Sequence, residues 1–506
     1  MSLAVIKTRA KLGVQAPAVV VEVHILNGLP GMSIVGMPET AVKESKERVK
    51  SAIVNSQFEF PARKIIVNLA PADLPKEGGR YDLPIALGIL VASGQIEEKN
   101  LSATEVLGEL ALSGELRPVS GVLPAAIKAS ELGREIWVPA ANAEEAALPE
   151  AVKVRPIETL AQICGFLQGS VEIGCQEVSA KEKSLPEDVP DLTDVVGQVM
   201  ARRALEIAAA GGHSLLMYGP PGSGKTMLAS RLPGILPPLT NKQAMSVAAV
   251  YSVSSQQGRR GKFWVPPFRA PHHTASAVAL VGGGSIPKPG EISLAHNGVL
   301  FLDELPEFGR RVLEVLREPL ESGEVVISRA AQQITYPARI QLVAAMNPCP
   351  CGYLGSINEI TKQPRCQCSQ EQVRRYRSRL SGPLLDRIDM HIEVNPVERK
   401  VLLDAHKGES SETVRARVMA AREWQWQRQS GVNAHLSVAG IREHCVLQKN
   451  DADFLQKALE KMQLSARASH RVLKLARTIA DLNQSERIAS PHITEALAYR
   501  NLDRKV

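Results

Sequence analysis

The sequence predicts an α/β protein with more than one domain and a helical region at its C-terminal end. At 506 residues the chain is longer than one hydrophobic core usually organises, and roughly two to four compact units are expected. Short apolar stretches of strand type alternate with helical stretches until about residue 400, where the strand pattern stops. Hydrophobic residues at 44% and charged residues at 22% are ordinary globular values, which excludes a disordered or fibrous chain.

The first predicted domain covers residues 1–170. Its apolar stretches predict strands over 18–25 and 64–69, and its longer amphipathic or apolar stretches predict helices over 39–55 and 81–94. Strands that alternate with helices indicate an α/β domain.

Residues 171–190 are expected to form a linker, because they are polar, acidic and without apolar periodicity. A second α/β domain follows over 191–400. Its alternation of strand, glycine-rich turn and helix is typical of a parallel sheet. The elements predicted for it are a helix over 198–210, a strand over 214–218, a helix from Lys225, and strands over 298–302 and 340–346.

The last predicted domain, residues 401–506, has only helical periodicity. Helices are predicted over 411–429 and 466–482. A helical lid on the preceding domain is the simplest interpretation.

The sequence carries no export or membrane signal that we recognise. The N-terminus becomes polar too early for a signal peptide, and no stretch approaches membrane-spanning length. An odd number of cysteines, seven, argues against a disulfide framework. We therefore expect a cytoplasmic protein.

A glycine-rich segment between a predicted strand and a predicted helix fits the phosphate-binding loop of nucleotide-hydrolysing enzymes. Glycines allow backbone amides to approach phosphates, and the helix N-terminus favours their negative charge. Lys225 is expected to reach the β and γ phosphates of ATP, and Thr226 to bind magnesium. The segment is Gly219-Pro220-Pro221-Gly222-Ser223-Gly224-Lys225-Thr226.

Asp303 and Glu304 follow an apolar strand at the end where ligands of a parallel sheet collect. Asp303 is expected to hold magnesium, and Glu304 to orient the attacking water. Alone, two acids after an apolar run often mark only a strand that leaves the core. The phosphate-binding loop favours the catalytic interpretation.

Three further residues carry weaker signals. Asn347 follows a strand and is expected to contact the γ phosphate or the water, although it can also serve only the turn before a proline. Arg387 follows a basic helix and is suited to stabilise charge across a subunit boundary, or to form a surface ion pair. Arg467, near a helix start, is either a sensor of nucleotide state or an ordinary surface residue.

Four cysteines within twenty residues form two Cys-x-Cys pairs joined by a loop rich in glycine and proline. Buried structural cysteines would favour strands or helices instead. Four thiolates around one zinc ion are the preferred interpretation, and they leave no open position for catalysis. The cysteines are Cys349, Cys351, Cys366 and Cys368.

Five segments carry a resemblance to a known family: residues 28–31 (GLPG), 68–79 (NLAPADLPKEGG), 271–273 (PHH), 290–298 (GEISLAHNG) and 380–387 (LSGPLLDR). With them, the chain resembles the ComM/YifB family of magnesium-chelatase-related AAA+ proteins nearly end to end. The resemblance implies a hexameric ring with ATP at subunit interfaces, with Asn347 as first sensor, Arg387 as arginine finger and Arg467 as second sensor. It also implies a branch-migration helicase that helps incoming single strands integrate during natural transformation.

If DNA passes through such a ring, two glycine-flanked segments are suited to contact it. They are the loop 282–290, with Lys288, and a hairpin over 321–337, with Arg329; both cations are candidates for phosphate contacts. Residues 191–506 hold 41 basic and 29 acidic side chains, a surplus of 12 that suits a polyanion. Ordinary exposed loops on a solvated basic surface are the alternative.

The stretch over 106–139 resembles the Lon-protease fold. In that fold the serine falls near 79–82, where no serine occurs, and the lysine falls near 121–123, where Leu123 stands. Without its nucleophile, proteolysis is implausible, so we expect a non-proteolytic domain for DNA engagement or ring assembly. The ATPase subunit of a metal chelatase and an ATP-dependent Lon-like protease remain as alternative functions.

Overall fold

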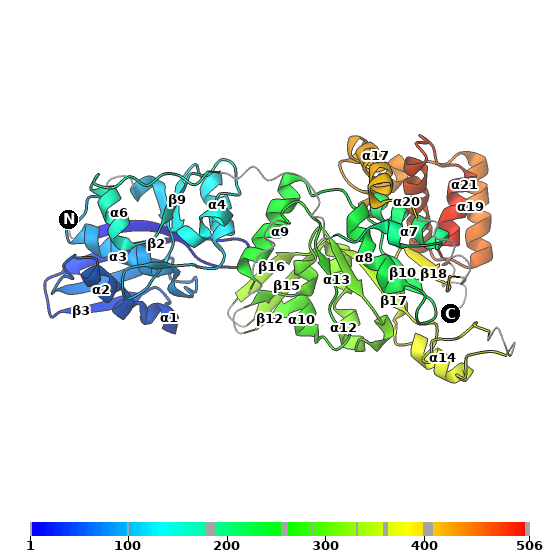
Figure 1. Cartoon of the computed structure of the whole chain (residues 1–506), viewed down its shortest axis with the longest axis horizontal. Helices are drawn as coiled ribbons and strands as arrows, with labels where there is room; N and C mark the ends of the chain where they lie inside the picture. The colour runs from blue at the N-terminus through cyan, green and yellow to red at the C-terminus, as the bar shows by residue number, and fades with distance from the viewer. Residues whose placement is uncertain are drawn as a thin grey trace. The chain divides into compact units, whose positions relative to one another are not determined.

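A computed structural model describes residues 3–98, 101–177, 189–254, 262–284, 287–329, 332–357, 363–397 and 408–500 (Figure 1). The chain divides into two compact units, Met1–Glu182 with Met245–Arg260, and Lys183–Ala244 with Gly261–Val506. Residues 178–188 of the expected linker and 401–407 of the expected lid lie outside the described residues. Each unit has its own architecture.

The N-terminal unit contains a seven-stranded sheet in the order β3-β4-β2-β1-β5-β8-β9. Burial alternates along β2, as expected for a strand with one face on a core, and β2 pairs antiparallel with both β1 and β4. The strands are β1 (Leu3–Arg9), β2 (Ala18–Leu26), β3 (Gly31–Val35), β4 (Lys64–Ala70), β5 (Thr104–Val106), β8 (Glu135–Pro139) and β9 (Val154–Ile157).

The helices of this unit are shorter than the sequence predicted in one place. The helix expected over 39–55 is divided into α1 (Thr40–Lys43) and α2 (Ser45–Asn55). The buried Ser45 hydroxyl donates to the Val42 carbonyl over 2.7 Å, a local bond of the kind that competes with helix continuation. The remaining helices are α3 (Asp82–Ala92), buried along its whole length, α4 (Val122–Glu131), α5 (Ala143–Ala146) and α6 (Leu160–Leu167).

The C-terminal unit is built on a five-stranded sheet in which all neighbouring strands are parallel, in the order β11-β14-β17-β10-β18. The three central strands are buried on both faces, as parallel sheets require. The predicted strands over 214–218, 298–302 and 340–346 are confirmed. The strands are β10 (Leu215–Tyr218), β11 (Phe268–Arg269), β14 (Val299–Leu302), β17 (Gln341–Met346) and β18 (Met390–Glu393).

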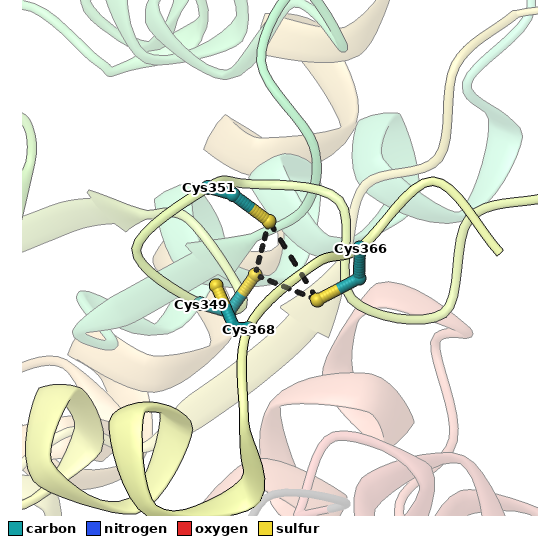
Figure 2. A group of neighbouring side chains, drawn as sticks. All are labelled: Cys349, Cys351, Cys366 and Cys368. Atoms are coloured by element: carbon teal, nitrogen blue, oxygen red, sulfur yellow. Dashed lines mark hydrogen bonds between the residues drawn. The ribbon is translucent and has the colours of Figure 1, made fainter.

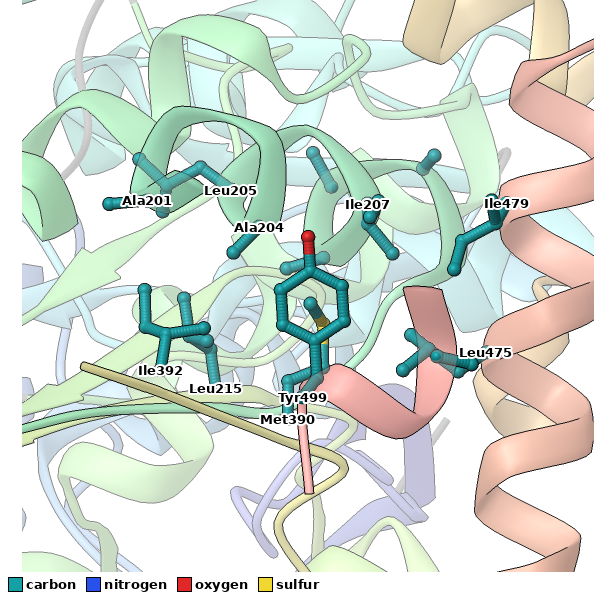
Figure 3. Packing of buried hydrophobic residues seen from close by; sticks show 14 of the residues in the cluster. Ala201, Ala204, Leu205, Ile207, Leu215, Met390, Ile392, Leu475, Ile479 and Tyr499 are labelled. Atoms are coloured by element: carbon teal, nitrogen blue, oxygen red, sulfur yellow. The ribbon is translucent and has the colours of Figure 1, made fainter. Parts of the chain in front are cut away.

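Helices cover this sheet and continue to the C-terminal end of the described chain. Figure 3 shows α7, the strands β10 and β18, and α20 contributing to one hydrophobic core, with Tyr499 among them. The helical character predicted beyond residue 400 is confirmed. They include α7 (Val199–Gly211), α8 (Lys225–Ile235), α17 (Ser411–Gln429), α18 (Val438–His444), α19 (Lys449–Met462), α20 (Ala466–Leu482) and α21 (Ser490–Ala498). Most of α9 (Asn241–Val253) belongs to the N-terminal unit, which includes Met245–Arg260.

Two small hairpins complete the C-terminal unit. One pairs β12 (Gly282–Gly283) with β13 (Lys288–Pro289), and the other pairs β15 (Glu324–Arg329) with β16 (Gln332–Pro337). Within the described ranges, no helix combines the length and the apolar character needed to cross a membrane.

Candidate active site

The glycine-rich loop lies between β10 and α8, as its sequence pattern predicted. A side chain at Gly219 would place its Cβ only 2.1 Å from the Val394 carbonyl oxygen, so the position accepts glycine alone. Gly222 and Gly224 have positive φ angles of 76° and 89°, which also favour glycine. The loop ends at the N-terminus of α8, a position that favours bound phosphates.

Lys225 opens α8, and its side chain is buried against its own loop. The ammonium donates to the carbonyl oxygens of Gly219 and Pro220 over 2.8 and 2.9 Å. It also donates to Oδ1 of Asn347 over 3.4 Å. Burial lowers the pKa of Lys225, and the charge of Asp303 opposes that effect. The positive charge is thus held by carbonyl oxygens of the loop and by Asn347.

Thr226, in the first turn of α8, contacts Asp303, which follows β14. The Thr226 hydroxyl donates to Oδ2 of Asp303 over 2.6 Å, and Oδ1 of Asp303 accepts the backbone N–H of Glu304 over 2.9 Å. A hydroxyl and a carboxylate at this distance are an oxygen pair that suits magnesium. Together with Lys225 and Asn347, they gather at the carboxyl ends of β10, β14 and β17.

Glu304 has a left-handed backbone, with φ at 52°, a conformation that is uncommon for non-glycine residues. Its half-exposed carboxylate lies 3.0 Å from Nδ1 of His273. His273 belongs to the Pro-His-His segment that carries the family resemblance, and its sequence pattern predicted no role for it. No local pattern could have paired these residues, because they are distant in the sequence.

Arg387 lies beyond α15 (Gly382–Leu385) and is mostly buried. Its guanidinium forms an ion pair with Glu321 at 2.5 Å and donates to the Pro383 carbonyl over 2.7 Å. Arg467 is exposed on the first turn of α20. We call Lys225, Thr226, Asp303, Glu304 and Asn347 the Lys225 cluster. Among the described residues, no hydrogen bond or ion pair joins either arginine to this cluster. Within one copy of the chain, both therefore stand apart from it.

The four cysteines come together in one cluster (Figure 2). Their Sγ atoms all lie within 4.8 Å of one another, a donor set that could hold a metal ion. The pKa of Cys351 is lowered to about 6: desolvation opposes this, but backbone hydrogen bonds from Tyr353 and Gln367 stabilise the thiolate. Three of the six Sγ separations are 3.4 Å for Cys349–Cys351, 3.7 Å for Cys349–Cys366 and 3.6 Å for Cys351–Cys366.

The two segments expected to contact DNA lie against each other. The buried Tyr336 hydroxyl of β16 donates to the Pro287 carbonyl over 2.8 Å. A Cβ at Gly282 would lie 3.0 Å from Cδ1 of Ile327 in β15. Lys288 is exposed, whereas the side chain of Arg329 and residues 285–286 lie outside the described part of the structure.

In the N-terminal unit, the two positions assigned to a Lon-type dyad are adjacent in space. The buried Arg80 guanidinium donates to the carbonyl oxygens of Ser120 and Gly121 over 2.6 and 3.3 Å. Leu123 is buried at the start of α4. An arginine bound to backbone carbonyls thus lies where the two segments meet.

Three family models match the chain. "Magnesium chelatase, subunit ChlI" matches residues 191–402, "Subunit ChlI of Mg-chelatase" matches residues 21–142, and "Magnesium chelatase, subunit ChlI C-terminal" matches residues 408–500. The first of these contains the complete Lys225 cluster.

Full-length relatives support the same assignment. The chain is 52% identical to the competence protein ComM of Haemophilus influenzae and to the uncharacterized protein YifB of Salmonella typhimurium, over 100% of this chain and 98% of each relative. It is 26% identical to the magnesium-chelatase 38 kDa subunit of Cereibacter sphaeroides over 30% of this chain and 51% of that protein. The chain therefore belongs to the ComM/YifB family of magnesium-chelatase-related AAA+ ATPases.

Proposed function

We propose that the protein is an ATP-driven DNA motor: a hexameric helicase that promotes branch migration and the integration of single-stranded DNA during natural transformation and homologous recombination. The convergence of Lys225, Thr226, Asp303 and Asn347 at one edge of a parallel sheet carries the ATPase part of this proposal. The competence role is supported by the full-length similarity to a protein named for competence.

The Lys225 cluster suits the hydrolysis of magnesium-bound ATP. Lys225 would leave its loop carbonyls to bind the β and γ phosphates, and Thr226 and Asp303 would hold the magnesium ion that accompanies the nucleotide. Asn347 would contact the γ phosphate. Glu304 would orient water for in-line attack, because phosphoryl transfer depends mainly on positioning and charge stabilisation.

The two arginines outside the cluster fit roles that need another subunit or a moving lid. In this proposal Arg387 acts on ATP bound to the neighbouring subunit, and Arg467 senses nucleotide state from the helical region. The ion pair between Arg387 and Glu321 must then open before the guanidinium can reach a phosphate. Hydrolysis would consequently depend on ring assembly.

The packed pair of hairpins is the proposed DNA contact. Lys288 is an exposed cation beside glycines, and Tyr336 ties its loop to the second hairpin, which carries Arg329. Contacts of this kind read the phosphate backbone and carry no base specificity. DNA affinity should therefore fall as salt rises, because binding releases counterions.

We further propose that the cysteine cluster holds a structural zinc ion. Tetrahedral Zn–S bonds of about 2.3 Å place the sulfur atoms about 3.8 Å apart. The separations of 3.4 to 3.7 Å among Cys349, Cys351 and Cys366 approach that value without a covalent disulfide, and Cys368 lies within 4.8 Å of all three. Four thiolates fill the coordination sphere, so the zinc would order the loop and take no part in hydrolysis.

The test of the DNA-motor proposal is strand exchange on forked and four-way DNA junctions with ATP and magnesium at low salt. Wild type should convert the junctions, and Lys225→Ala and Glu304→Gln should not. Lys288→Ala should weaken junction binding, whereas Lys457→Ala, an equal charge change at an exposed position of α19, should not. Intact junctions together with hydrolysis that ignores DNA would exclude the motor.

A second candidate function is the ATPase subunit of a metal chelatase. The three family models, all described by a chelatase subunit, favour it. This function predicts ATP-dependent metal insertion into a tetrapyrrole by a partner subunit, with junctions left unchanged. Measuring insertion and strand exchange on the same preparation separates the two functions.

A further inference from the structure

We infer that the four-cysteine loop is a positioning element of the ATP site: the metal bound there fixes Asn347 and supports the phosphate-binding loop. This inference rests on the proposed metal centre and on ATP hydrolysis, and it does not depend on DNA. The segment between Met346 and Cys368 connects the sheet edge to the cysteine cluster.

The first connection runs along the chain. Strand β17 ends at Met346, and Asn347 follows directly. Oδ1 of Asn347 accepts a hydrogen bond from the Lys225 ammonium. Only Pro348, with its restricted φ angle, separates Asn347 from the buried Cys349. A metal bond at Cys349 therefore fixes the backbone two residues from the side chain that faces the nucleotide.

The second connection is a close approach of the two loops. Gly352, next to the ligand Cys351, has a φ angle of 84°. A Cβ at Gly352 would lie 2.8 Å from Cδ of Pro221 and 3.8 Å from Cγ of Asn347. The backbone of the cysteine loop thus lies directly on the phosphate-binding loop, at a distance that excludes a side chain.

The third connection returns from the other cysteine pair. Ser369, immediately after Cys368, caps α14 (Gln370–Arg377) through a capping box. Tyr376 on that helix is buried and has a hydrogen bond with the Asn347 backbone. Arg377 also donates to the Pro348 carbonyl over 3.4 Å. Both cysteine pairs are therefore connected to Asn347 and Pro348, the first pair along the chain and the second through α14.

Beyond the cysteines, local contacts order the described part of the loop: the Arg365 N–H donates to the Ser356 carbonyl over 2.9 Å, and the Arg365 guanidinium lies 4.1 Å from the centroid of the Tyr353 ring. Among the described residues of 350–368, Gly352 alone is buried, so apolar packing contributes almost nothing within that part. A segment without a hydrophobic core depends on metal ligation for its conformation. Losing the metal should release Asn347 and the Pro221 contact while the main core of the unit, built on the sheet and its helices, stays folded.

The experiment compares Cys366→Ser, Gly352→Ala and Cys175→Ser in the full chain, with metal content, thermal unfolding, kcat and KM for basal ATP hydrolysis as readouts. Cys366→Ser should lose its zinc and lower kcat about 10- to 100-fold, as displacement of a positioning group does, with a smaller change in KM. Gly352→Ala should keep the zinc and still lower kcat. Cys175, exposed in the N-terminal unit, serves as the matched thiol control and should change nothing.

A double-variant cycle decides whether the metal acts through Asn347. Asn347→Ala combined with Cys366→Ser should lose clearly less than the product of the two single losses, because coupled residues give non-additive effects. Multiplied losses would overturn the inference, and so would a Cys366→Ser protein that lacks zinc but keeps the wild-type kcat. A wild type that binds no zinc overturns the metal centre as well, and leaves the ATP site and the DNA motor standing.

Discussion

Each unit of the molecule buries a lysine, and one of the two lysines lies in the proposed ATP site. Lys225 is 8% exposed and Lys76 is fully buried; burial lowers the pKa of both, and both donate to backbone carbonyls, in the case of Lys76 to that of Pro71. The difference lies around them. An aspartate raises the pKa of each lysine, Asp303 in the case of Lys225 and Asp73 in the case of Lys76. Among the described contacts, only Lys225 also donates to a side chain from another strand end, that of Asn347. A buried cation indicates a site only where polar groups from neighbouring strands converge on it.

Substituting each of the two lysines should give the largest difference in ATP hydrolysis. Lys225→Ala should lower ATP hydrolysis about 1000-fold, since charge stabilisation of the transferring phosphate is lost. Lys76→Met should leave kcat per folded molecule unchanged and destabilise the N-terminal unit by about 1–3 kcal/mol, because a buried carbonyl loses its donor. Steady-state hydrolysis and urea unfolding of both variants measure these effects. Equal loss of hydrolysis in the two variants would contradict the proposal that Lys225, and not Lys76, acts in ATP hydrolysis.

Substituting Glu304 should lower kcat less than Lys225→Ala does, and should leave ATP binding intact. Glu304→Gln should lower kcat about 100-fold while ATP affinity is retained, because a group that orients water acts mainly in the transition state. His273→Ala should cost less, since His273 contacts Glu304 and touches no other group of the Lys225 cluster among the described contacts. Binding of a fluorescent ATP analogue, measured beside kcat, separates the two effects. Loss of nucleotide binding in Glu304→Gln would assign the carboxylate to a different role.

Lowering the pH should destabilise the C-terminal unit more than the N-terminal unit. Burial lowers the pKa of His296 to about 4 and that of His391 to about 3, both in the C-terminal unit. The unfolded chain binds more protons than the folded one between these values and about 6.5, so stability falls as pH falls through that window. From pH 6.5 to 5.5 the loss is about 1 kcal/mol for each histidine, on the order of 2 kcal/mol together.

Single-tryptophan variants make this loss measurable by unit. Trp137 reports on the N-terminal unit and Trp424 on the C-terminal unit. Urea unfolding at the two pH values should shift the Trp424 transition more than the Trp137 transition, because the N-terminal unit contains one histidine, His24. An equal shift of both transitions would contradict a role for the buried histidines.

The parts of the site that the sequence predicted are those with a local cause. The strand, glycine turn and helix around Lys225 follow from apolar runs and glycines over a few residues, and the strand before Asp303 follows from the same kind of pattern. The clustering of four cysteines was also predictable, because two close pairs with proline and glycine between them suit a metal better than a core.

The parts that the sequence did not predict depend on contacts between distant residues. The contact of Lys225 with Asn347 joins residues 122 positions apart, and the His273–Glu304 pair and the Gly352–Pro221 approach are also products of the folded chain. The assignment of residues 245–260 to the N-terminal unit was likewise invisible. Periodicity shows that a helix is amphipathic, and it does not show which core the helix joins.

The central claim, that ATP binds where Lys225, Thr226, Asp303 and Asn347 converge, is tested most directly by photo-crosslinking an azido-ATP analogue to the full chain and mapping the label by mass spectrometry. The account predicts labelled peptides from the C-terminal unit around residues 219–226, protection by unlabelled ATP, and loss of the label in Lys225→Ala but not in Lys76→Met. A label on the N-terminal unit, or undiminished labelling of Lys225→Ala, would contradict it.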